Sequence, residues 1–233
     1  KRKKIILAGG SGFLGRMLAE YYREGNSEVV ILSRGGRSVP SARVVRWDGR
    51  TLGRWTEELE GATALINLCG RSVNCRYTSR NRKQIMDSRI DSTRILGKAI
   101  RKCSHPPRVW MNLSTATIYK HTYGPPNDEL SGMIRPSTAA RDAFSVSVAK
   151  AWEKEFARAD VSSTRRCVLR CAMVFGQEPG GVCTVLRRLT RFGLGGRMGD
   201  GEQWVSWIHR DDFCRGIDWL MENEDAHAIY NFC

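Results

Sequence analysis

A glycine-rich turn near the N-terminus is the part of the sequence best suited to hold a phosphate group. Residues 9–15 read Gly-Gly-Ser-Gly-Phe-Leu-Gly, so glycines recur at Gly9, Gly12 and Gly15. In this pattern the first glycine permits a tight turn, the second lets the backbone approach a pyrophosphate, and the third lets helix and strand pack closely. An ordinary glycine turn is the alternative. Because the motif lies between a strand-like run and a helical pattern, we predict a dinucleotide site at a helix N-terminus.

The end of the second predicted strand indicates which dinucleotide binds. A carboxylate at this position favours NAD, because it binds the ribose hydroxyls and repels a 2′-phosphate. The sequence here is Leu32-Ser33-Arg34, with Arg37 close behind and no carboxylate. Since a guanidinium can grip a phosphate with two hydrogen bonds, we predict NADP(H), with Ser33 and Arg34 at the 2′-phosphate. The alternative is that Arg34 is one surface arginine among 29.

The elements that must position these residues alternate between strands and helices along the chain. Such alternation indicates βαβ units and a parallel sheet, and right-handed crossovers make that sheet doubly wound. We therefore predict an α/β, Rossmann-type fold in a single domain over residues 1–233, without repeats or a linker. The expected strands cover residues 4–8, 28–33, 43–47, 64–69, 108–114, 166–175, 203–208 and 229–232. The expected helices cover 13–23, 78–102, 143–158, 182–192 and a last one ending at 221 that Asp211 or Asp212 could cap.

The charge of the chain raises the question of nucleic-acid binding. Lys and Arg number 38 against 24 Asp and Glu, which gives a formal net charge of +14. A nucleic-acid binder gathers its basic residues on one face or in one run. The only dense run is at residues 1–4, and it leads straight into an apolar stretch. This pattern favours a solvated basic surface, and we expect no nucleic-acid partner.

Cysteine usage and apolar runs bear on the compartment. The eight cysteines form no Cys-x-x-Cys pair, and no histidine lies at zinc-ligand spacing from two of them, so we predict no metal site. Cys69, Cys167 and Cys171 lie in strand-like stretches, where cysteine behaves as a small hydrophobe, which is typical of a reducing compartment. No run approaches the roughly 18 apolar residues of a membrane span. We expect a soluble, cytoplasmic protein without a membrane partner.

Taken together, the motifs resemble the short-chain dehydrogenase/reductase superfamily, and within it the extended branch of NAD(P)-dependent epimerase/dehydratase-like proteins, often labelled nucleoside-diphosphate-sugar epimerases. The matching segments span nearly the whole chain. They are Gly-Gly-Ser-Gly-Phe-Leu-Gly (9–15), Leu-Ser-Arg (32–34), Trp-Asp-Gly (47–49), Ile-Asn-Leu-Cys-Gly (66–70), Asp-Ser-Arg-Ile-Asp-Ser-Thr-Arg (87–94), Ser-Thr-Ala-Thr-Ile-Tyr (114–119), Leu-Arg-Cys-Ala-Met-Val-Phe-Gly (169–176), Gly-Leu-Gly-Gly (193–196) and Trp-Ile-His-Arg-Asp-Asp (207–212).

The resemblance implies further contacts with the cofactor. Asp48 would meet the adenine amino group with Trp47 beside it, and residues 68–70 would line the pyrophosphate and the nicotinamide ribose. Arg89 would lie beneath the cofactor, and Val174, after Met173, near the carboxamide. The predicted cofactor-binding residues are Gly9, Ser11, Gly12, Phe13, Leu14, Gly15, Ser33, Arg34, Trp47, Asp48, Leu68, Cys69, Gly70, Arg89, Lys150 and Val174.

The family's catalytic residues are only partly present. Relatives use a Ser or Thr after the fifth strand to orient a carbonyl, and a Tyr-x-x-x-Lys in which the Tyr shuttles a proton and the Lys holds the ribose. Thr115 and Lys150 match, but Val146 stands where the Tyr should be. Tyr119 and Tyr123 are near in sequence without occupying that position.

Two functions remain open at this point. One is an NADP(H)-dependent oxidoreductase or epimerase-like enzyme acting on a small carbonyl or hydroxyl substrate, and the other is a catalytically silent NADP(H)-binding sensor. His209 could face the substrate or bond locally. The resemblance implies that residues of about 176–210 contribute to a small substrate-binding region. It also implies that this region is incomplete, because relatives continue past Cys233.

Overall fold

The computed structural model describes residues 2–35, 38–137, 140–197 and 199–233. Its main sheet has seven parallel strands in the order β3-β2-β1-β4-β5-β6-β9. The chain therefore builds outward from β1 in one direction, returns, and builds outward from β4 in the other. The strands are β1 (Lys4–Ala8), β2 (Glu28–Ser33), β3 (Arg43–Arg46), β4 (Ala64–Asn67), β5 (Val109–Thr115), β6 (Arg165–Cys171) and β9 (Ala228–Phe232).

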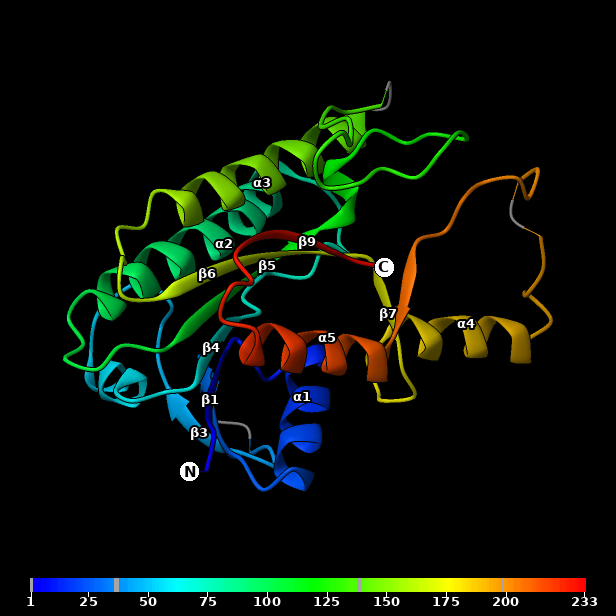
Figure 1. Ribbon diagram of the computed structural model, residues 1–233. Coiled ribbons are helices and arrows are strands. Elements are labelled where there is room, and N and C mark those ends of the chain that lie inside the picture. The colour runs from blue at the N-terminus through cyan, green and yellow to red at the C-terminus, as the bar shows by residue number, and fades with distance from the viewer. Residues whose placement is uncertain (1, 36–37, 138–139, 198) are drawn as a thin grey trace.

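Helices cover both faces of this sheet. Figure 1 shows α2 (Ser79–Ile100) and α3 (Ala140–Ala157) on one face, and α1 (Phe13–Glu24) and α5 (Arg210–Glu222) on the other. Each face has its own apolar core, because the buried strand residues alternate between the two sides. The predicted doubly wound α/β fold is confirmed. None of the helices in the described part of the chain combines the length and apolar character that a bilayer span needs.

Two local predictions were wrong. The expected strand over 166–175 is two strands, because the hydrogen-bond partner changes: Ala172 still donates its N–H to Phe232 on β9 (2.9 Å), whereas Met173 donates to the carbonyl of Ser206 (3.3 Å). The second piece, β7 (Met173–Phe175), pairs instead with β8 (Trp207–His209) in a separate small sheet. The cap of α5 is His209, whose Nδ1 accepts the N–H of Asp211 at 3.3 Å, so neither aspartate is the cap.

The remaining elements are three short helices, one of which lies among exposed apolar side chains. The sequence did not predict two 3-10 helices: η1 (Arg54–Leu59) follows the loop after β3, and η2 (Ala116–Ile118) begins directly at the end of β5. The helix α4 (Val182–Arg191) buries none of its side chains. Apolar side chains are exposed on and near it, at Met173, Val185, Leu186, Leu189, Phe192, Leu194, Trp204, Val205 and Trp207.

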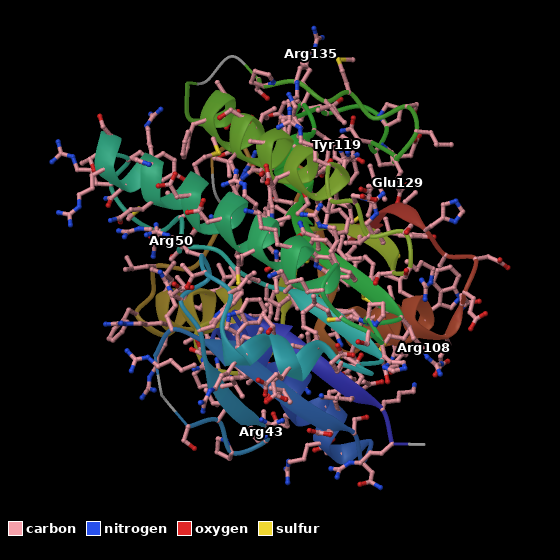
Figure 2. All side chains as sticks on the ribbon, turned by 90° about the vertical axis from the view of Figure 1, so that its left-hand side faces the viewer. Arg43, Arg50, Arg108, Tyr119, Glu129 and Arg135 are labelled. Carbon is pink, nitrogen blue, oxygen red and sulfur yellow. The ribbon has the colours of Figure 1, made fainter. Side chains whose placement is uncertain are left out.

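Basic side chains are spread over the molecule. Figure 2 shows Arg43, Arg50, Arg108 and Arg135 at separate places on the structure. Several other arginines are engaged internally; Arg165, for example, donates to the carbonyls of residues 220 and 226. The expectation that nucleic acid is not a partner stays a prediction.

A buried polar cluster fixes the end of β4 to its neighbours. The Asn67 amide donates to Asn112 Oδ1 (2.7 Å) and to Thr93 Oγ1 (3.0 Å), and Trp152 Nε1 donates to the same threonine oxygen (2.9 Å). Asn67 Oδ1 accepts the N–H of Cys69 at 3.1 Å. Strands β4 and β5 and helices α2 and α3 are therefore joined at one point, which also sets the backbone direction after β4.

We predict that Asn112→Leu lowers the free energy of unfolding by about 2–3 kcal/mol, because it leaves buried donors on Asn67 and Thr93 without their acceptor. Urea unfolding at pH 7 measures this. The exposed Asn74→Leu is the control, and we expect it to change the free energy by less than about 0.5 kcal/mol. Equal effects of the two substitutions would contradict the importance of the cluster.

Candidate functional site: a cleft at the reversal of strand order

A cleft of about 880 Å³ opens where β1 and β4 end, at the point where the strand order reverses. In open parallel sheets this is the position at which ligands bind. The lining residues come from the glycine turn, the ends of β2, β3 and β4, and one side of α2. They are Gly9, Ser11, Gly12, Ser33, Arg34, Gly35, Trp47, Asp48, Gly49, Arg50, Leu68, Cys69, Gly70, Arg71, Gln84, Ser88, Asp91 and Ser92.

The glycine turn has the geometry of an anion cradle. Gly9 has φ +75°, and a Cβ there would lie 2.8 Å from Cys69 Sγ. A Cβ on Gly15 would lie 2.2 Å from the Gly10 Cα, so the helix packs directly on the turn. A Cβ on Gly12 would meet nothing within 4 Å, because this residue faces the open cleft. Gly12 caps α1 without a side-chain bond, and the first turn holds no acidic residue, so the helix N-terminus suits a pyrophosphate.

The end of β2 forms one wall of the cleft. Ser33 is buried there and Arg34 is exposed, and both line the cleft. The N–H of Trp47 donates to the carbonyl of Ser33 (3.2 Å), which holds the ends of β2 and β3 together. Arg37, the other arginine considered for a phosphate, lies outside the described residues.

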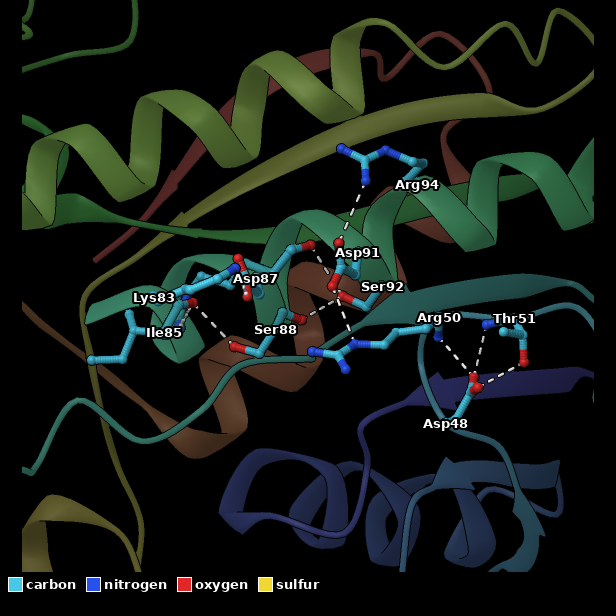
Figure 3. Close-up of polar contacts among 11 residues, drawn as sticks. Asp48, Arg50, Thr51, Lys83, Ile85, Asp87, Ser88, Asp91, Ser92 and Arg94 are labelled. Carbon is cyan, nitrogen blue, oxygen red and sulfur yellow. Dashed lines mark hydrogen bonds and ion pairs between the residues drawn. The ribbon is translucent and has the colours of Figure 1, made fainter. Parts of the chain in front are cut away.

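Asp48 closes a tight turn on this wall. Its carboxylate accepts the N–H groups of Arg50 and Thr51 (2.8 Å each) and the Thr51 hydroxyl (2.6 Å), as Figure 3 shows. The hydroxyl bond to Thr51, followed by the backbone bonds, lowers the pKa of Asp48 to about 2. The carboxylate therefore remains ionised at neutral pH, with most of its acceptor capacity used within the turn.

An ion pair joins the two walls of the cleft. Arg50 Nε lies 3.2 Å from Asp91 Oδ2 on α2, so the guanidinium reaches from the Asp48 turn to the helix (Figure 3). Arg94 pairs with the other oxygen of Asp91 at 3.4 Å. Sequence reasoning missed this pair, because nothing distinguishes Arg50 from the other arginines. The lining residues of α2 could have been found from the sequence, since the polar residues 84, 88, 91 and 92 recur at helical spacing and so share one side of the helix.

The loop after β4 forms the floor. Leu68, Cys69 and Gly70 all line the cleft, and their contact with a cofactor stays a prediction. Burial raises the pKa of the Cys69 thiol to about 12, so it stays protonated at neutral pH. Arg89 lies behind this floor: a Cβ on Gly70 would be 3.0 Å from its guanidinium carbon, and Arg89 lies over the Trp152 ring at 5.2 Å. Burial lowers the pKa of Arg89.

Other predicted cofactor residues lie outside the lining of the cleft. The side chains of Phe13 and Leu14 pack with the core under α1, and Phe13 also abuts Gly181. Gly15 acts through its packing on the turn. Val174 is buried in β7, and Lys150 is exposed on α3. The binding roles of these residues stay predictions.

Thr115, at the end of β5, has its hydroxyl engaged locally. Its Oγ1 accepts the N–H of Thr117 (3.2 Å) and shares a hydrogen bond with the Thr117 hydroxyl (3.0 Å). Thr115 does not line the cleft itself, so its catalytic role also stays a prediction.

A buried ionic network begins at Ser114, the residue before Thr115 on β5. The Ser114 hydroxyl donates to Glu153 Oε1 (2.6 Å), and Glu153 holds both sides of the buried Arg170 guanidinium (3.0 and 2.8 Å). Arg170 also donates to the Tyr119 hydroxyl (2.7 Å), which donates to Asn231 on β9 (3.0 Å). Figure 2 shows Tyr119 beside this end of the sheet. The Tyr119 hydroxyl therefore accepts one hydrogen bond, from Arg170, and donates another, to Asn231.

Comparison with known proteins agrees with this arrangement. The family described as NAD dependent epimerase/dehydratase matches residues 5–233. This chain belongs to that family. Among its members, an epimerase family protein of Staphylococcus saprophyticus is 31% identical over 232 residues, covering 99% of this chain and 74% of the relative. The Bos taurus epimerase family protein SDR39U1 is 30% identical over 231 residues, covering 98% and 73%.

A solved structure supports the same assignment to the epimerase/dehydratase family. The crystal structure of human epimerase family protein SDR39U1 (isoform 2) with NADPH has a TM-score of 0.79 and 26% identity, covering 98% of this chain and 73% of that one. A nucleoside-diphosphate sugar epimerase from Corynebacterium glutamicum has a TM-score of 0.77 at 24% identity, covering 99% of this chain and 46% of that one, and it shows the shared fold.

We predict opposite outcomes for two alanine substitutions in the glycine turn. Gly15→Ala should destabilise the fold by about 3 kcal/mol or more, because its Cβ would overlap the backbone of Gly10. Gly12→Ala should leave the free energy of unfolding within about 0.5 kcal/mol but weaken dinucleotide binding at least about ten-fold, because the methyl group would occupy the cradle. Urea unfolding and NADPH titration measure the two effects. If Gly12→Ala binds NADPH normally, the cradle is not the pyrophosphate site.

Proposed function

We propose that this protein binds NADP(H) in the cleft and acts as an oxidoreductase or epimerase-like enzyme on a small carbonyl or hydroxyl substrate. The observation that carries the proposal is the glycine turn at the strand-order reversal, combined with Arg34 and the lack of a carboxylate at the end of β2. The NADPH in the related human structure supports it. The pyrophosphate would lie on the N-terminus of α1, with Ser33 and Arg34 at the 2′-phosphate.

The remaining cleft residues fit the rest of such a cofactor. Trp47 and Asp48 would flank the adenine, and Leu68, Cys69 and Gly70 would support the pyrophosphate and the second ribose. The nicotinamide ring supplies or accepts a hydride when bound. Thr115 would orient the substrate oxygen by a hydrogen bond, and Lys150 would hold ribose hydroxyls after its flexible side chain turns toward the cleft.

A catalytically silent NADP(H)-binding protein is the second candidate. Val146 is 2% exposed, so a buried methyl group occupies the position at which relatives carry the proton-shuttling Tyr. Tyr119 is engaged with Arg170 and Asn231, so it does not replace that residue in this arrangement. A silent protein would use the cleft to sense the cofactor without turning over a substrate.

We also propose that residues 176–210 belong to the substrate side of the same domain. Tryptophan and leucine side chains are exposed there, including Leu194 and Trp204. Trp204 Nε1 donates to the carbonyl of Tyr123 (3.2 Å), which links this segment to the loop after β5. A small-molecule substrate would approach from this side.

Cofactor titration tests the first part of the proposal. We expect NADPH to bind at least about ten-fold more tightly than NADH, because the 2′-phosphate gains a charge-assisted bond from Arg34. Tryptophan fluorescence or calorimetry at fixed ionic strength measures both. Tighter binding of NADH would refute the cofactor assignment.

Turnover tests the enzyme against the silent protein. NADPH oxidation is followed over a panel of aldehydes, ketones and nucleotide sugars. For an enzyme, we expect Thr115→Val to lower kcat about 100-fold with the NADPH dissociation constant unchanged, because the hydroxyl acts on the substrate only. No oxidation of NADPH with any substrate, despite NADPH binding, would favour the silent protein.

A further inference from the structure

A second hollow of about 470 Å³ adjoins the cofactor cleft on the β3 side. It shares Arg34, Trp47 and Asp48 with the cleft, so the two spaces have a common wall. The Trp47 and Trp55 rings meet edge to face at 5.1 Å, and Trp55 Nε1 is anchored to the carbonyl of Thr51 (3.0 Å). One side of the hollow is therefore a fixed aromatic surface.

Three guanidinium groups line this hollow. Arg34 follows β2, Arg46 ends β3, and Arg54 begins η1. Arg46 is the register partner of Ser33 in the parallel β2–β3 ladder. Because partner residues on adjacent strands point to the same face of a sheet, the Arg46 side chain leaves the sheet beside Ser33, the residue predicted at the 2′-phosphate.

These three arginines differ from their neighbours in lacking a partner. Arg43, on the same strand as Arg46, binds Glu58 with two hydrogen bonds of 2.6 Å, and Arg50 pairs with Asp91. Within the part of the chain that the structure describes, no carboxylate or carbonyl binds the guanidinium of Arg34, Arg46 or Arg54. The single carboxylate of the hollow, Asp48, makes its hydrogen bonds inside its own turn.

Three like charges around one hollow repel each other unless an anion lies among them. A phosphate monoester carries about two negative charges and three acceptor oxygens, which suits several guanidinium groups. A nucleotide in the cleft brings its adenosine ribose to the end of β2, and therefore to the shared wall.

We propose that Arg46 and Arg54, together with Arg34, hold the 2′-phosphate of NADP(H) and set the preference for this cofactor over NAD(H). The inference rests on the proposed function, since it assumes a dinucleotide in the cleft. Cofactor specificity then comes from three segments of the chain, namely the end of β2, the end of β3 and the start of η1. Arg46 and Arg54 are specificity-determining residues that touch only the phosphate.

The experiment compares NADPH with NADH, and 2′,5′-ADP with 5′-ADP, on the full chain. Each pair differs by the 2′-phosphate alone. We expect Arg46→Gln and Arg54→Gln each to raise the dissociation constants of NADPH and 2′,5′-ADP about ten-fold, with those of NADH and 5′-ADP within about two-fold of the wild type. Arg101→Gln, an exposed arginine at the end of α2, is the charge-matched control and should change none of them.

The outcomes separate the inference from the proposed function. If the wild type prefers NADPH but both glutamine variants keep its affinity, the inference is overturned and the proposed function stands. If the wild type shows no preference for NADPH, both are overturned. Equal weakening of NADPH and NADH would mean that Arg46 and Arg54 act on the whole cleft, which also contradicts a specific 2′-phosphate role. Urea unfolding of each variant checks that the fold is intact.

Discussion

The contact between α1 and the turn before it is the constraint on which the site depends. A Cβ on Gly15 would overlap the backbone of Gly10, and a Cβ on Gly10 would overlap the side chain of Leu7. A Cβ on Gly9 would likewise overlap Cys69. This packing brings the helix N-terminus to the gap between β1 and β4 and aims its free N–H groups into the cleft. Gly12, by contrast, is free of protein neighbours. The same turn therefore combines three tightly packed glycines with an open one.

The floor of the cleft depends on buried polar groups. Asn67 lies at the end of β4 and uses both ends of its amide, one toward Asn112 and Thr93 and the other toward the backbone of Cys69. The floor of the cleft is thus fixed to α2 and α3 through the interior. Arg89 supports that floor from behind, between Gly70 and the ring of Trp152.

Much of this could be predicted from the sequence, because local patterns determine it. The alternation of strands and helices predicts the parallel sheet, and the glycine spacing predicts the turn at the first helix. Features that depend on distant contacts could not be predicted. The strand breaks at Ala172 because the residues after it pair with β8 instead of β9, and the Arg50–Asp91 pair joins residues 41 positions apart. His209 as the cap of α5 was hidden because two aspartates, better cap formers, follow it.

In the candidate site, too, the sequence predicts what depends on local patterns and misses what depends on distant contacts. Residues of the glycine turn and of the loop after β4 line the cleft, because each segment directly follows a strand. Thr115, Lys150 and Val174 depend on how helices and loops pack on the sheet, and none of them lines the cleft. A sequence motif indicates which residues follow a strand, but it does not indicate the direction in which their side chains point.

The position of Trp47 has an optical consequence. Its indole is 6% exposed and forms part of the wall shared by the cleft and the adjoining hollow. A reduced nicotinamide absorbs light at the wavelengths that tryptophan emits, so excitation energy can pass from this ring to a bound dinucleotide. The oxidised form lacks that absorption. The wall of the cleft thus carries an intrinsic reporter that distinguishes the redox states of its ligand by the colour of the emitted light.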